Sequence, residues 1–162
     1  MSPLHPPDAE FLSRLEQALG PGALVPPEPR YLEEPRGRFE GRAAAIARPA
    51  DTAGVAATVR LCAAEGVGIV PYAGGTGLVG GQVLPTGPDP IVLSVERLSG
   101  IRDLDRIDNV IEVGAGTVLA EVQDAARDAG RLFPLSLASE GSAQIGGLLA
   151  TNAGGVAVLR YG

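Results

Sequence analysis

The residues of this chain with the clearest chemical potential form a glycine-rich stretch, 71–81 (PYAGGTGLVGG). Five of its eleven residues are glycine, and none carries a charge. It follows a short apolar run, residues 67–70, which the sequence predicts to be a buried strand. A strand that leads into a loop with few side chains can bring backbone N–H groups close to a phosphate. The stretch therefore predicts a site for a phosphate-bearing ligand.

Two familiar nucleotide motifs have similar spacing, and neither fits. Residues 75–80 (GTGLVG) match G-x-G-x-x-G, and Glu96 stands about 20 residues further on, where a ribose-binding acid belongs. That motif must open a helix, but residues 82–90 (QVLPTGPDP) contain three prolines and cannot be helical. A Walker A loop requires lysine where Gly81 stands and serine or threonine where Gln82 stands.

A third interpretation is a phosphate cradle made of loop backbone alone. It suits a pyrophosphate diester, because several N–H groups can satisfy its two charges without a cation. The alternative is that the glycines only make a flexible or tightly turned connection. A second uncharged glycine-rich cluster, residues 141–155, favours the first view, because one extended ligand lying across both clusters would explain the pair.

Composition narrows the function classes. The chain has 162 residues, enough for one domain, and a net charge of −6, which argues against general binding to nucleic acid or anionic membranes. All 13 basic residues are arginine, so lysine chemistry is excluded. The single cysteine, Cys62, forms no internal disulfide, and a reducing, cytoplasmic location is expected. No apolar run is long enough to span a membrane, and the N-terminus has no signal-peptide pattern.

The elements that must position the first cluster can be predicted from periodicity. Residues 8–19 predict a helix capped by Asp8, and residues 21–42 an extended arm. Residues 43–48 and 67–71 predict parallel strands joined by a helix that Asp51 or Thr52 caps and Gly66 ends. The core stripe expected on that joining helix is Val55, Val59 and Cys62, with Thr58 and Leu61 beside it.

The second half of the chain predicts a strand at 91–95 and a hairpin of strands 101–105 and 110–113. A helix capped by Thr117 should run to Ala129 and end at Gly130. From residue 135 the periodicity disappears, which predicts a long loop, and long loops are usually functional.

Residues 71–81 together with 133–162 (FPLSLASEGSAQIGGLLATNAGGVAVLRYG) closely resemble the FAD-binding (PCMH-type) domain of vanillyl-alcohol-oxidase-type flavoproteins. The nearest branch contains D-lactate dehydrogenases, D-2-hydroxyglutarate dehydrogenases and the FAD subunit of glycolate oxidase. The resemblance implies an α+β fold, with a small βαβ-containing sheet beside part of a second sheet and FAD between them. Residues 1–42 would be a tail, helix and arm, and 43–162 an FAD-binding domain that is incomplete at its C-terminus and lacks the substrate domain.

The resemblance also implies which residues bind FAD. The pyrophosphate loop would contain Ala73, Gly74, Gly75, Thr76, Gly77, Leu78 and Gly81. The ribityl and flavin side would be lined by Pro134, Gly141, Ser142, Ile145, Gly146 and Gly147. Thr151, Asn152, Gly154 and Gly155 would approach the ring and the pyrophosphate from the other side. Some relatives attach flavin covalently through a histidine at the position of Thr76, so non-covalent FAD is expected here.

The function that the resemblance implies is oxidation of a small D-2-hydroxy acid of the lactate, glycolate or 2-hydroxyglutarate type, by hydride transfer to flavin N5. No catalytic or metal-binding residue is assigned in this chain, because the family carries the base, the carboxylate-binding cations and a metal-holding histidine cluster in a later domain. His5 is expected to be a solvated tail residue. The chain alone is expected to have little turnover. The alternatives are a flavin-binding accessory subunit and an inactive truncated remnant.

Overall fold

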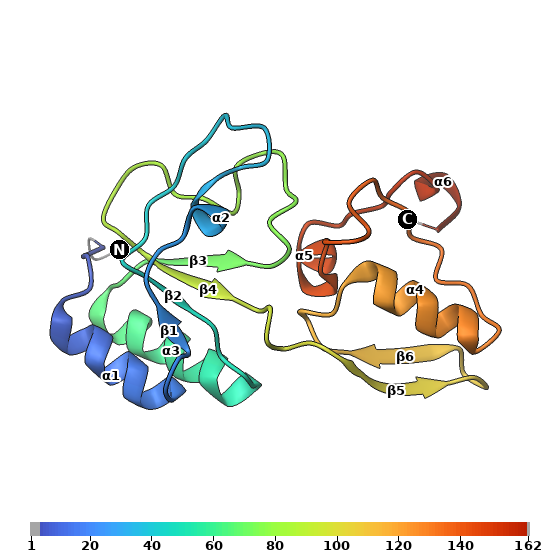
Figure 1. Cartoon of the computed structure of the whole chain (residues 1–162), viewed down its shortest axis with the longest axis horizontal. Coiled ribbons are helices and arrows are strands. Elements are labelled where there is room, and N and C mark those ends of the chain that lie inside the picture. The colour runs from blue at the N-terminus through green and yellow to red at the C-terminus, as the bar shows by residue number, and fades with distance from the viewer. Residues whose placement is uncertain (1–3, 162) are drawn as a thin grey trace.

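A computed structural model describes residues 4–161 of the chain, which form two lobes (Figure 1). The N-lobe (residues 4–94) contains α1 (Ala9–Leu19), β1 (Leu24–Val25), α2 (Pro29–Leu32), β2 (Ala45–Ala47), α3 (Thr52–Glu65), β3 (Ile69–Tyr72) and β4 (Ile91–Ser94). The C-lobe (residues 101–161) contains β5 (Ile101–Asp105), β6 (Val110–Val113), α4 (Leu119–Asp128), α5 (Ile145–Ala150) and α6 (Val158–Tyr161). Residues 95–100 are the connection between the lobes.

The N-lobe is built on a four-stranded sheet in the order β1-β2-β4-β3. Strands β2 and β3 both pair in parallel with β4, which lies between them, so the predicted parallel βαβ arrangement is confirmed. β1 pairs antiparallel with β2 at one edge. β3 is the other edge, where Pro71 is tolerated because an edge strand has a free side that needs no N–H group.

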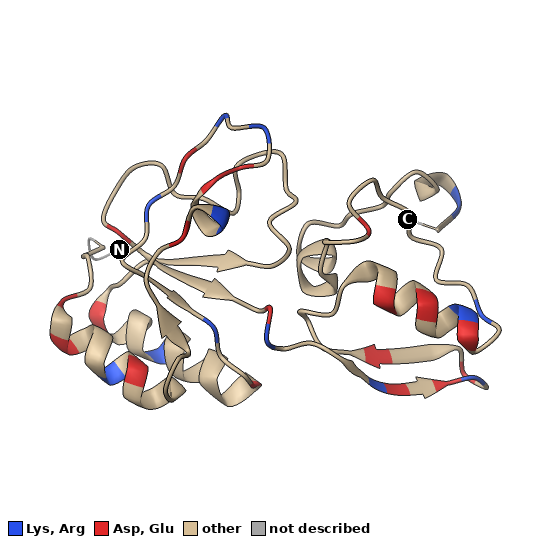
Figure 2. Cartoon of the chain, viewed as in Figure 1, with Lys and Arg blue, Asp and Glu red and all other residues tan. Residues whose placement is uncertain are grey.

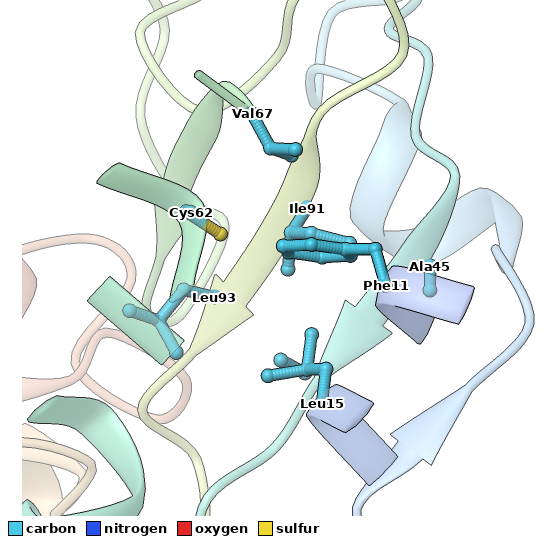
Figure 3. Packing of buried hydrophobic residues seen from close by; sticks show 8 residues of the cluster. Phe11, Leu15, Ala45, Cys62, Val67, Ile91 and Leu93 are labelled. Atoms are coloured by element: carbon cyan, nitrogen blue, oxygen red, sulfur yellow. The ribbon is translucent and has the colours of Figure 1, made fainter. Parts of the chain in front are cut away.

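Each face of this sheet is covered. On one face, Phe11 and Leu15 of α1 pack against Ile91 of β4 (Figure 3). On the other, Tyr31 of α2 packs against Val92. Successive residues of β4 therefore point to opposite faces, as the pleat of a strand requires. Fully burying one such phenylalanine or leucine side chain contributes about 1.5–3 kcal/mol, so this core holds the N-lobe together.

Most predicted boundaries in the N-lobe are confirmed. The Asp8 carboxylate accepts a hydrogen bond from Phe11 N at 2.8 Å and caps α1, and Gly66 ends α3 in the left-handed conformation. Two predictions are wrong. The arm at 21–42 is not simply extended, since it contains β1 and α2, and Val59 is 44% exposed because α3 turns Thr58 and Cys62 toward the sheet.

The C-lobe begins with the predicted hairpin, which is confirmed as an antiparallel pair of β5 and β6. Asp105 closes its turn, since its carboxylate accepts from Ile107 N at 2.7 Å and Asp108 N at 3.0 Å. These two N–H groups lower the pKa of Asp105. No helix among residues 4–161 is long and apolar enough to cross a bilayer.

Two predictions in the C-lobe need correction. Thr117 does not cap α4, which begins after Val118; its buried hydroxyl instead bonds Gly100, accepting from the N–H at 3.0 Å and donating to the carbonyl at 3.2 Å. The segment after residue 135 is also not a plain loop, because α5 and α6 lie in it. Both helices are too short to show a period in the sequence.

Candidate functional site

The first glycine loop (residues 73–81) leaves β3 directly after Tyr72. Within residues 4–161, none of the backbone N–H groups of positions 74–81 donates a hydrogen bond. Two carbonyl groups of the loop do have partners, since Gln82 Nε2 donates to Gly75 O at 3.3 Å and to Gly77 O at 2.8 Å. The loop is therefore held through its carbonyls while its donors stay free. This is the arrangement that an anion-binding loop requires.

The base of the first glycine loop is formed by Tyr72. Gly75 has φ +67°, and a Cβ added there would overlap the Tyr72 hydroxyl, so only glycine suits this position. The hydroxyl donates to Arg30 O, and burial raises the pKa of Tyr72. On its outer side the loop is held by the segment after α2, since Arg36 donates to Leu78 O.

The second glycine segment (residues 141–155) has similar composition and a different structure. Many of its donors are paired: Ile145 N donates to Thr117 O at 3.0 Å, Gly146 N to Ala115 O at 2.7 Å, and Leu148 N to Gln144 O at 3.1 Å. Its hydroxyl groups also bond their own backbone, since Thr151 Oγ1 donates to Gly147 O at 2.9 Å. This segment is a packed support around α5.

The two segments touch, and glycine makes the contact possible. A Cβ on Gly74 would overlap the carbonyl oxygen of Ser142, and a Cβ on Gly147 would lie 2.9 Å from the Cβ of Ala73. In Figure 1 the turn after β3 accordingly lies beside α5. Figure 2 shows no charged residue on either segment where they meet. We call this contact the loop junction.

Eight of the predicted site residues fall into two groups in the structure, and the other predicted residues belong to neither group. Ala73, Gly74, Ser142 and Gly147 meet at the loop junction. Others line an apolar groove of about 280 Å³ in the C-lobe, and no residue of the first glycine loop is among the described residues that line it. The predicted residues in this groove are Pro134, Ile145, Asn152 and Gly154, and the apolar side chains around them include Phe133, Leu135, Leu148 and Leu149.

Two glutamines were missed by the sequence reasoning. Gln82 orders the first loop, as described above. Gln144 lies within the second glycine segment, and its Oε1 is buried without a hydrogen-bond partner in the described part of the chain. The backbone N of Gln144 would lie 3.1 Å from a Cβ on Gly74, which places it at the loop junction. The available signal was position alone, because Gln82 directly follows the first glycine-rich stretch and Gln144 stands inside the second.

The geometry can be tested against a dinucleotide ligand. Free N–H groups on positions 74–81 suit the oxygens of a diphosphate, and the unpartnered Gln144 Oε1 suits a hydroxyl or N–H donor. Gly81 and Gly141 face open space, so a ligand could approach their backbone closely. The two segments contain no acidic side chain that would repel a phosphate and no basic side chain that would pair with it. The residues present therefore fit such a ligand.

Comparison with known proteins decides the family. The FAD binding domain family matches residues 43–162, which is most of the chain. The chain belongs to this family. Its cofactor is accordingly FAD, and the two sheets of the fold are those of a PCMH-type FAD binding domain.

The relatives indicate which enzymes carry this FAD binding domain. The chain is 42% identical over 159 residues to a D-2-hydroxyglutarate dehydrogenase of Xanthomonas citri pv. viticola, covering 96% of the chain and 33% of that protein. It is 35% identical over 125 residues to a D-2-hydroxyglutarate–pyruvate transhydrogenase of Saccharomyces cerevisiae, covering 77% of the chain and 25% of that protein. The chain thus spans about a third or less of these relatives.

A solved structure supports the fold. Alkyldihydroxyacetonephosphate synthase superposes with a TM-score of 0.82 and 20% identity, covering all of this chain and 32% of that one. At this identity the likeness concerns the fold alone. The role of each predicted FAD-binding residue stays a prediction, as does the boundary at residues 42/43, although Phe11 of α1 shares a core with Ile91 of β4.

Proposed function

We propose that the chain is the FAD-binding part of an oxidoreductase that oxidises a small D-2-hydroxy acid, of the 2-hydroxyglutarate, lactate or glycolate type. The observation that carries this proposal is the set of free N–H groups on positions 74–81, held against a second glycine segment. The substrate class rests on what the relatives' names state, among them D-2-hydroxyglutarate dehydrogenase. When bound, FAD supplies the hydride acceptor for such an oxidation.

In this proposal the pyrophosphate lies on the first glycine loop and the flavin side extends toward the second glycine segment. Gly74, Gly75 and Gly77 expose the backbone that would meet the phosphate oxygens, and Gln144 Oε1 would accept a hydrogen bond from the bound cofactor. Thr76 has no nitrogen nucleophile, so we propose that this FAD is bound non-covalently.

The chemistry on the substrate would need a base, and none is placed at the loop junction. His5 N donates to Gly66 O and bridges Val67, at the end of β3 opposite to the first glycine loop. The chain's own residues would therefore bind and orient FAD, and groups elsewhere in the protein would handle the hydroxy acid. An assay of the 162-residue chain with D-2-hydroxyglutarate, D-lactate and glycolate should accordingly show no turnover with an artificial electron acceptor.

The binding proposal is tested by titrating the cofactor-free chain with FAD, ADP and riboflavin. FAD and ADP should compete for one site, and riboflavin, which lacks the pyrophosphate, should bind about a hundredfold more weakly, since two to three charge-assisted hydrogen bonds are lost. Acid precipitation should release all of the flavin into the supernatant. Tight riboflavin binding with no competition by ADP would contradict the assignment of the first glycine loop.

A matched pair of variants completes this test. Gly75→Val should abolish FAD retention, because a side chain at φ +67° is strained and overlaps Tyr72. Gly68→Val is the control, because a Cβ at Gly68 makes only ordinary contacts of 3.6 Å with Leu4 and Pro90. Equal FAD retention by the two variants would contradict the proposal.

A further inference from the structure

Glu96 stands on the connection between the lobes, and within residues 4–161 its carboxylate forms hydrogen bonds and ion pairs only with N-lobe side chains. Its carboxylate accepts from the Tyr31 hydroxyl at 2.9 Å and pairs with Arg30 at 3.3 Å and Arg48 at 3.4 Å. The Glu96 side chain is 21% exposed, so these pairs are partly shielded from solvent. We call these four residues the Glu96 cluster.

The Glu96 cluster is linked to the first glycine loop. Tyr31 is completely buried and packs edge-on against Tyr72, with ring centroids 5.0 Å apart. Tyr72 donates to Arg30 O, and Gly75 lies directly over its hydroxyl. Burial, reinforced by the bond to Glu96, raises the pKa of Tyr31 to about 12, so it stays a donor at any physiological pH.

The same connection also leads to the second glycine segment. Gly116 N donates to Leu98 O at 3.0 Å, and Cβ atoms on Gly114 or Gly116 would overlap carbonyls of the connection. The turn at 114–117 then holds the second segment, because Ala115 O accepts from Gly146 N at 2.7 Å. The Glu96 carboxylate therefore stands between two series of contacts. One series ends at the first glycine loop and the other at the second glycine segment, on the two sides of the loop junction.

We propose that Glu96 is a positioning residue for the FAD site: by fixing the connection to Arg30, Tyr31 and Arg48, it sets the angle between the lobes at which the two glycine segments meet. This inference rests on the proposed function and extends it to a residue outside both glycine segments. Nothing else in the connection supplies a charge that the arginines can bind, since Arg97 is itself basic and donates to Arg48 O.

The test measures the angle between the lobes without cofactor. Spin labels on Glu16→Cys of α1 and Asp128→Cys of α4 report the distance between the lobes, and buried Cys62, whose pKa burial raises to about 11, stays unlabelled. Glu96→Gln should broaden and shift the distance distribution, because an amide N–H₂ faces two guanidinium groups that have lost their counter-charge. Asp89→Asn is the control, since the Arg42–Asp89 pair at 2.7 Å lies within the N-lobe.

The second measurement is FAD affinity, which a residue important only for folding would not change in a folded variant. Glu96→Gln should weaken FAD binding about tenfold and Tyr31→Phe about threefold, with Asp89→Asn unchanged. Circular dichroism checks that each variant is folded. If Glu96→Gln does not fold, Tyr31→Phe, which keeps the packing, replaces it in both measurements.

The outcomes separate the two proposals. Failure of the wild-type chain to bind FAD contradicts the proposed function, while the distance distribution still tests the role of Glu96 in setting the lobe angle. Unchanged distances in a folded Glu96→Gln variant overturn the inference whether or not FAD binds. Changed distances with undiminished FAD affinity overturn it as well.

Discussion

The two glycine segments look alike in sequence and use glycine for different purposes. In the first, residues 73–81, backbone donors at 74–81 are free within the described chain, and the carbonyls are held by Gln82. In the second, residues 141–155, the backbone is folded around α5, and many donors bond carbonyls within the C-lobe. Glycine allows close contacts in both segments, as at Gly74 and Gly147, but only the first segment leaves all of its donors at 74–81 free. Shared composition therefore does not imply a shared role.

The physical cause lies in what flanks each segment. The first leaves an edge strand and runs into residues 82–90, whose prolines prevent a helix, and its backbone donors find no carbonyl partner in the described chain. The second contains Ile145 and Leu148, which pack in the C-lobe core with Leu119 and so anchor a short helix there. A ligand can therefore take the donors of the first segment, while the second fixes the distance across the loop junction.

After the loss of FAD retention expected for Gly75→Val, the largest effect should come from adding one methyl group at the loop junction. Gly74→Ala places a Cβ into the carbonyl oxygen of Ser142 and 3.0 Å from the Cα of Ala143, and backbone atoms cannot move aside as a flexible side chain can. Overpacking of this kind costs about 2 kcal/mol, so FAD affinity should fall about thirtyfold. The measurement is a flavin fluorescence titration of the cofactor-free protein.

The control for that variant is Gly68→Ala, which also adds a methyl group but meets only ordinary contacts. It should keep wild-type affinity and gain slightly in stability toward urea, because alanine restricts the unfolded chain. If Gly74→Ala binds FAD as tightly as Gly68→Ala does, the two segments do not need to touch for binding, and the role assigned to the second segment is wrong.

A smaller effect should follow from removing the donor that holds the first loop. Gln82→Glu keeps the size of the side chain and loses the bonds to the carbonyls of Gly75 and Gly77. Two lost hydrogen bonds of about 0.5–1.5 kcal/mol each predict a decrease in FAD affinity of about tenfold, since the loop donors are no longer held in place. The measurement is the same flavin fluorescence titration, and the free energy of unfolding in urea should fall by at most a similar amount.

A glutamine-to-glutamate exchange in the C-lobe is the matched control for the loss of FAD affinity at Gln82. Gln123→Glu loses a bond of 2.7 Å from Nε2 to Leu135 O, a carbonyl beside the apolar groove, and a longer one of 3.5 Å to the Glu140 carboxylate. It should lower the free energy of unfolding and leave FAD affinity within about threefold of wild type, because no donor of the first loop depends on it. Equal losses of affinity at both glutamines would mean that the two segments are not distinguished by their free donors.

The sequence predicted the parts of this fold that depend on local signals. Asp8 and Gly66 mark helix ends in any context, and the continuous apolar run of Ile91, Val92 and Leu93 marks a strand buried on both faces. The glycine spacing in the two segments was enough to indicate the FAD family, which the comparison confirmed.

What the sequence could not predict depends on contacts between distant residues. The sequence predicted Thr117 as a helix cap, but its hydroxyl forms hydrogen bonds with Gly100 instead. It predicted Val59 as a core residue, but Thr58 is the residue of α3 that is buried there. The Glu96 cluster joins residues that lie 48 to 66 positions apart, so no spacing rule could find it. The same holds for the different use of glycine in the two segments, which is visible only where Gly74 meets Ser142.

The smallest effect is expected at Thr151, which the sequence predicted to contact FAD. Its hydroxyl donates to Gly147 O at 2.9 Å and so belongs to the packing of α5. Thr151→Val should therefore cost about 0.5–1 kcal/mol in urea unfolding while FAD affinity stays within about twofold, and Thr151→Ser should behave as wild type. If Thr151→Val instead loses tenfold in affinity and Thr151→Ser does not, the hydroxyl also serves the cofactor. The second segment would then supply a second polar contact beside that proposed for Gln144, and the packing role assigned to the Thr151 hydroxyl would be wrong.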